Sequence, residues 1–159
     1  MLWLADAYAE GALLLCNALA EGDYQRQYTN TRVVLHLCRH ATELFLKGAV
    51  CHKTKNRPPK THRLDTLYAA YRLHYPHQIY ELDLPFPVEV FNPDQGLFPD
   101  LLDEYKRVHD QRFRYPADGE GNPFEDSEWF DILAYQLAIE RFRSSINHAV
   151  ARIDLGWRL

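Results

Sequence analysis

Two arginines and one histidine near the end of the sequence, Arg141, Arg143 and His148, have the chemistry needed to cleave RNA. In such cleavage the 2′-hydroxyl attacks the phosphate, a histidine takes up or supplies a proton, and a guanidinium stabilises the developing charge without a metal. Seven residues of a helix turn through about 700°, so Arg141 and His148 nearly align, whereas Arg143 and His148 point about 140° apart. These three are our candidate catalytic residues, and Arg141 is the better geometric partner of His148.

The same side chains also have an ordinary structural interpretation. They can form salt bridges with Glu140 or Asp154 on a solvated face, and cations near the C-terminus of a helix are favoured by the helix dipole. Ser144, Ser145 and Arg152 share the stripe of Arg141 and His148. Both interpretations therefore remain open from the sequence.

A second polar stripe follows the apolar stripe of the segment from about residue 29 to 51. Residues spaced three and four apart lie on one side of a helix, and this side carries Arg32, His36, Arg39, His40, Glu43 and Lys47. We take Arg39, His40, Glu43 and Lys47 as candidate substrate-binding residues. A metal site built from His36, His40 and Glu43 is a weaker alternative, because the more specific HExxH pattern is absent. We therefore expect neither a metal nor another cofactor.

A third basic cluster lies between residues 107 and 115, and Arg112 and Arg114 are candidate phosphate contacts within it. The alternative is that these arginines complement the C-terminal dipole of a helix predicted over residues 100–113. Phosphate-binding glycine loops, a GxSxG elbow and a DxDxDG calcium loop are all absent from the sequence. Classical nucleotide hydrolases and serine hydrolases are therefore poor candidates.

Composition limits the class of protein further. The chain has 159 residues, a formal net charge of −4 and 47% hydrophobic residues, which is typical of a globular domain. No segment approaches the roughly 18 uninterrupted apolar residues of a membrane span. Three cysteines without a CxxC pair suit neither a disulfide framework nor a zinc ribbon, so we expect a cytoplasmic protein. Because the net charge is negative, any RNA binding must depend on a local basic surface.

Hydrophobic periodicity predicts the elements that position these residues. Apolar residues recur at helical spacing in five segments, at about residues 3–20, 29–51, 64–75, 100–113 and 127–155. Prolines interrupt the pattern in the basic loop 52–60 and in an irregular insertion over residues 76–99. The prediction is one all-α domain spanning residues 1–159, a mainly antiparallel four- to five-helix bundle.

Three short motifs resemble those of the HEPN family of prokaryotic helical domains. They are residues 39–48 (RHATELFLKG), 60–67 (KTHRLDTL) and 112–116 (RFRYP). The resemblance implies a four- or five-helix bundle that is commonly a dimer. Many members look like metal-independent ribonucleases of toxin or defence systems that carry an Arg-x(4 to 6)-His motif, and others bind nucleotidyltransferases. Here Arg143 to His148 and Arg141 to His148 fit the two limits of that spacing.

The leading hypothesis is therefore a HEPN-like homodimer that binds or cleaves RNA, with the second-helix stripe beside Arg141, Arg143 and His148. The alternative is a non-catalytic module that binds a partner protein such as a nucleotidyltransferase. Exposed aromatic residues in the insertion would favour that alternative, because contiguous aromatic surface is typical of interfaces. The residues concerned are Tyr80, Phe86, Phe91 and Phe98.

Overall fold

A computed structural model describes residues 1–22, 28–86, 121 and 131–155. Within these residues the chain forms helices and no strand, which confirms the predicted all-α class. The elements are α1 (Leu2–Glu21), α2 (Tyr28–Thr54), α3 (Leu64–His74), the short 3-10 helix η1 (Gln78–Tyr80) and α5 (Ile132–Asp154). The helix predicted over residues 100–113 and most of the insertion lie outside the described residues.

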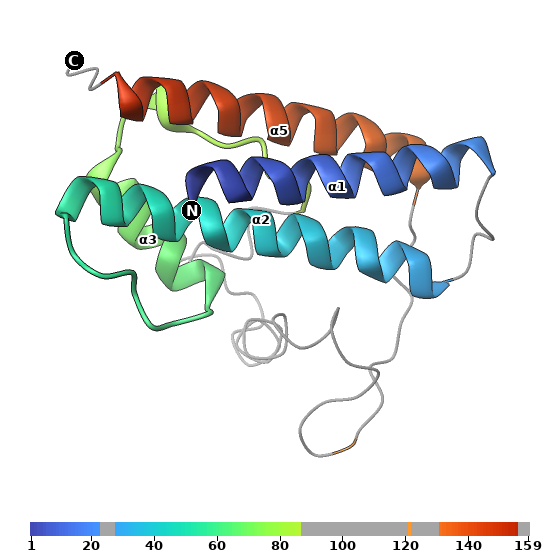
Figure 1. Cartoon of the computed structure of the whole chain (residues 1–159), viewed down its shortest axis with the longest axis horizontal. Coiled ribbons are helices and arrows are strands. Elements are labelled where there is room, and N and C mark those ends of the chain that lie inside the picture. Colours follow the sequence, from blue (N-terminus) through green and yellow to red (C-terminus); the bar gives the residue numbers. More distant parts are fainter. Residues whose placement is uncertain (23–27, 87–120, 122–130, 156–159) are drawn as a thin grey trace, which may run out of the picture.

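The helix α1 lies between α2 and α5 and packs along both (Figure 1). It runs antiparallel to α5, because Asp6 near its start contacts Arg143, whereas Cys16 near its end contacts the carbonyl of Ile132. The shorter α3 packs across the C-terminal half of α2 (Figure 1). This arrangement buries one apolar side of each helix and leaves the polar stripe of α5 facing outward.

Two buried clusters form the core. The larger one joins α1, α2, α3 and α5 around Phe45, Tyr71, Phe142 and Ile146. The smaller one joins α1, α2 and α5, and it includes Cys16 and Cys38 as small apolar side chains. Burial raises the pKa of Cys16 to about 11 and raises that of Cys38 further, so both thiols stay protonated at neutral pH.

Local signals in the sequence explain where the helices begin and end. Asp131 caps α5, because its Oδ1 accepts hydrogen bonds from the backbone N–H groups of Leu133 and Ala134. The predicted capping signal at residues 127–128 lies outside the described residues. α1 ends at Gly22, whose φ of 83° is the left-handed conformation that closes many helices. α2 ends in the same way at Lys55.

An aromatic cluster holds η1 against the bundle. Tyr71 Oη donates a 2.6 Å hydrogen bond to the carbonyl of Tyr80, and the Tyr75 and Tyr80 rings lie 5.0 Å apart. Tyr75 Oη also donates to the carbonyl of Ala49 on α2, and burial raises the pKa of Tyr75 to about 12. Tyr80 is therefore a buried core residue and not part of an exposed aromatic surface, whereas Phe86 is half-buried.

Candidate functional site

A pocket of about 380 Å³ lies between the C-terminal half of α5 and the segment that begins at η1. Both sides of the pocket carry polar residues, and Ile79 adds apolar surface. From α5 it takes Arg141, Ser144, Ser145, His148 and Arg152, and from the facing segment it takes Gln78, Ile79, Glu81 and Asp83. The pocket therefore brings together two stretches that are about 60 residues apart in the chain.

Two polar contacts fix the walls of this pocket relative to each other. The backbone N–H of Asp83 donates a 3.1 Å hydrogen bond to Ser145 Oγ, which in turn donates to the carbonyl of Phe142. Arg152 donates from Nη1 to the carbonyl of Ile79. Ser145 and Arg152 are thus positioning residues, because their polar groups hold the segment of residues 79–83 on α5.

Arg141 and His148 lie on the exposed side of α5, and both line this pocket. Seven residues correspond to about 10.5 Å along a helix axis, and Ser144, which lies between them in the sequence, lines the same pocket. The long, flexible side chain of Arg141 can cover that separation, so its guanidinium can contact a ligand that also contacts the imidazole of His148. The pair can therefore act on one phosphate-sized ligand.

Arg143 points away from the pocket and joins α5 to α1. Its Nε lies 2.9 Å from Asp6 Oδ1, and its Nη2 lies 3.2 Å from Glu10 Oε1. Asn147 Nδ2 also donates to Asp6 Oδ1. The hydrogen bond to Asp6 and the two carboxylates raise the pKa of Arg143, although partial burial opposes them. Arg143 therefore links α5 to α1, and it does not belong to the pocket lining that contains Arg141 and His148.

The sequence did not predict the acidic residues of the pocket. Glu81 and Asp83 face the cationic side of α5, and Glu81 also lies 3.7 Å from Arg72. The pocket is therefore mixed in charge, with carboxylates opposite a guanidinium and an imidazole. Carboxyl and imidazole side chains are the groups that most often transfer protons in acid–base catalysis.

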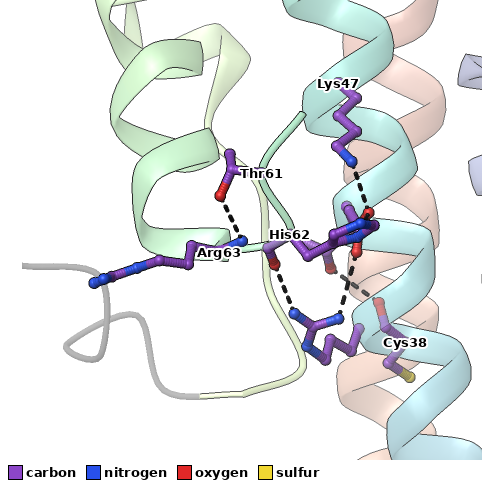
Figure 2. Close-up of polar contacts among 8 residues, drawn as sticks. Cys38, Lys47, Thr61, His62 and Arg63 are labelled. Atoms are coloured by element: carbon purple, nitrogen blue, oxygen red, sulfur yellow. Dashed lines mark hydrogen bonds and ion pairs between the residues drawn. The ribbon is translucent and has the colours of Figure 1, made fainter. Parts of the chain in front are cut away.

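The second-helix stripe forms a separate network that covers Glu43. Lys47 Nζ donates to Glu43 Oε1 at 2.9 Å, and His62 Nδ1 lies 2.8 Å from the same oxygen (Figure 2). Arg39 donates from Nη1 to Glu43 Oε2 at 3.4 Å and from Nη2 to the carbonyl of His62 at 2.7 Å. Both Arg39 and Glu43 are buried. The network therefore attaches the segment before α3 to α2, and none of its members lines the pocket on α5.

Electrostatics favour the ionised form of Glu43. Burial alone would raise its pKa, but the hydrogen bonds and positive charges of Lys47 and His62 outweigh burial and hold the pKa below its ordinary value of 4.5. Glu43 is therefore a carboxylate at neutral pH with its oxygens occupied. Its contacts give Glu43 a structural role, and its predicted role in substrate binding stays a prediction.

The remaining candidates have different environments. His40 packs edge-on against Tyr8 of α1 with ring centroids 4.5 Å apart, and the His36 ring lies 6.1 Å from that of His40. Among the described residues no group of three His, Cys, Asp or Glu side chains is arranged to hold a metal ion. Arg112 and Arg114 lie outside the described residues.

Comparisons with known proteins add no family to this geometry. No protein-family model, no curated protein and no solved structure matches the chain. In the part of the chain that the structure describes, no helix has the length and apolar character needed to cross a membrane.

Proposed function

We propose that the pocket on α5 is the active site of a metal-independent endoribonuclease, in a HEPN-like domain of a toxin or defence system. The observation that carries the proposal is that Arg141 and His148 line one pocket, whereas Arg143 is held by α1. The family part of the proposal rests on the sequence resemblance, and residues of two of its motifs, Arg39 to Lys47 and His62, are in contact around Glu43.

The proposed reaction uses groups from both walls. A carboxylate of Glu81 or Asp83 accepts the proton of the 2′-hydroxyl, whose oxygen then bonds to phosphorus. The bond from phosphorus to the 5′-oxygen breaks, and His148 in its protonated form supplies a proton to that leaving oxygen. Arg141 stabilises the extra negative charge on the phosphate. The products are a 2′,3′-cyclic phosphate and a 5′-hydroxyl.

The test is cleavage of a mixed RNA pool in EDTA. We expect the wild type to cleave, and we expect His148→Ala and Arg141→Ala each to lose at least about a hundredfold in rate, which is typical for removing one acid–base or charge-stabilising group. His74→Ala, which removes a histidine outside the pocket, is the matched control. The proposal fails if the wild type is inactive or if the two pocket variants cleave as fast as the control.

A second candidate function is a non-catalytic interaction module that forms a homodimer or binds a partner protein such as a nucleotidyltransferase. It is favoured by the apolar side chains that α1 leaves in solvent, since Trp3 is 71% exposed, Leu14 is 63% exposed and Leu4 is 50% exposed. The measurement is the molar mass of the protein in solution. An interface on α1 would be supported if the wild type is a dimer and Trp3→Glu is a monomer. The control Thr66→Glu adds the same charge on α3 and should remain a dimer.

A further inference from the structure

The connection between α2 and α3 is strongly basic in a chain of net charge −4. Residues 52–63 contain no acidic residue, and their lysines and arginines are Lys53, Lys55, Arg57, Lys60 and Arg63. All five are exposed. The segment leaves the end of α2 as a loop on the side of α3 (Figure 1). Neither the pocket nor the Glu43 network uses any of these five cations.

Ordinary structural roles account for two of the five. Lys53 lies in the last turn of α2, where a cation complements the helix dipole, and its Nζ is 5.8 Å from the centre of the Tyr75 ring. Arg63 pairs with Asp65 at 2.8 Å. By contrast, no carboxylate within the described ranges pairs with Lys55, Arg57 or Lys60. These three charges are therefore available to an outside anion.

Lys55 has a left-handed backbone conformation, which glycine adopts more easily than lysine does. Its φ is 59°, and its N–H donates to the carbonyl of Cys51, so it closes α2 in the left-handed conformation. Glycine is the preferred residue at that position, as Gly22 illustrates at the end of α1, and a side chain there costs roughly 1 kcal/mol. Within the described residues the Lys55 ammonium makes no hydrogen bond, ion pair or ring contact, so the lysine contributes an unpaired positive charge at this position.

The segment is held at both ends. At the start, Thr54 Oγ1 donates to the carbonyl of Val50 and accepts from the N–H of Asn56. At the other end, the Glu43 network binds His62 through its ring and through its carbonyl. Pro58 and Pro59 restrict the backbone between these anchors. Cations on such a segment lose less conformational freedom on binding than cations on a free loop.

We propose that Lys55, Arg57 and Lys60 form a docking surface for the phosphate backbone of single-stranded RNA. This inference deepens the proposed function, since it rests on RNA being the substrate, and it assigns backbone binding to a surface separate from the chemistry. Residues 55–60 contain no aromatic side chain on which a base could stack. The surface therefore binds phosphates irrespective of base sequence.

The test is binding of a 2′-O-methyl RNA strand, which lacks the attacking hydroxyl, as a function of salt concentration. The loop variant Lys55→Gly/Arg57→Gln/Lys60→Gln removes three cations, and the glycine suits the left-handed position. Loss of three phosphate contacts makes the slope of log K against log salt shallower by about 2. The affinity that the variant loses relative to the wild type is therefore roughly a hundredfold larger at 0.1 M salt than at 1 M salt. The control Ala7→Glu/Ala69→Glu/Ala134→Glu changes the net charge by the same amount at exposed sites on other surfaces.

The outcomes separate this inference from the active-site proposal. Weaker binding and a flatter slope for the loop variant, with the alanine-derived control close to wild type, would support the docking surface. Unchanged binding by the loop variant, or equal weakening in the control, would overturn it. Tighter loop-dependent binding to anionic phospholipid vesicles than to RNA would also overturn it, in favour of a membrane surface. Cleavage of unmodified RNA that survives His148→Ala would instead overturn the active site, whatever the binding result.

Discussion

His62 Nδ1 lies 2.8 Å from Glu43 Oε1, so a side chain of the α2–α3 connection contacts a carboxylate that is almost inaccessible to solvent. Lys47 reaches the same oxygen, and Arg39 reaches both the other oxygen and the His62 carbonyl. Burial makes an unpaired charge costly, so each member of the network depends on the others.

Glu43→Ala is expected to destabilise the fold by about 3 kcal/mol. The substitution leaves the buried guanidinium of Arg39 without its carboxylate, and removing one partner of a buried ion pair is far more costly than removing an exposed one. The free energy of unfolding in urea measures this effect. Glu10→Ala is the control, because its ion pair with Arg143 is half exposed and should cost well under 1 kcal/mol. Equal losses for both variants would contradict a central role for Glu43.

Stability should depend on pH through Glu43. Because its folded-state pKa lies below the ordinary value of 4.5, the unfolded chain binds this proton more readily. The stabilisation is therefore fully present above about pH 4.5 and is lost as the pH falls through the folded-state pKa. The free energy of unfolding in urea should fall more steeply in that pH range for the wild type than for Glu43→Gln, because glutamine cannot titrate there. Parallel pH profiles for the two proteins would show that other carboxylates dominate.

Asp131→Ala should cost about 1 kcal/mol of stability, because Asp131 Oδ1 satisfies two backbone N–H groups at the start of α5. Asp131→Asn, which retains a side-chain oxygen acceptor, should recover most of that loss. Thermal unfolding of the three proteins measures the difference. If the asparagine variant were as unstable as the alanine variant, charge and not capping would be the important property.

Arg143 and Asp6 should show a measurable coupling of up to about 1 kcal/mol in a double-mutant cycle, since their ion pair is partly exposed. The cycle compares Arg143→Gln, Asp6→Asn and the double variant by urea unfolding. In RNA cleavage, Arg143→Gln should lose activity only in proportion to its unfolded fraction, unlike Arg141→Gln. A loss of rate in fully folded Arg143→Gln would return this arginine to the list of catalytic candidates.

Local sequence patterns predicted much of this molecule. The apolar spacing of three and four residues located α1, α2, α3 and α5, because each helix buries one stripe in the core. Helix geometry also indicated that Arg141 is a better partner for His148 than Arg143 is. In the structure Arg141 and His148 line the same pocket. Their catalytic roles remain predictions.

Long-range contacts account for what the sequence did not predict. Glu81 and Asp83 reach the pocket because Ser145 and Arg152 hold their segment on α5, and no periodicity encodes that contact. Arg143 pairs with Asp6 and Glu10 of α1 instead of lining the pocket, and these two residues lie more than 130 residues earlier in the chain. Similarly, the residue spacing of α2 placed Arg39 and Glu43 on a polar side of the helix. It could not indicate that His62, from the connection to α3, contacts both of them.

The two-walled pocket has a consequence for when activity can arise during synthesis. Its first wall, at residues 78–83, leaves the ribosome well before α5, which supplies the other wall and fixes the first through Ser145 and Arg152. Because such non-local contacts form only after the chain that separates them has been made, a nascent polypeptide without α5 has no pocket. The proposed ribonuclease activity would therefore arise only after α5 has docked on residues 78–83.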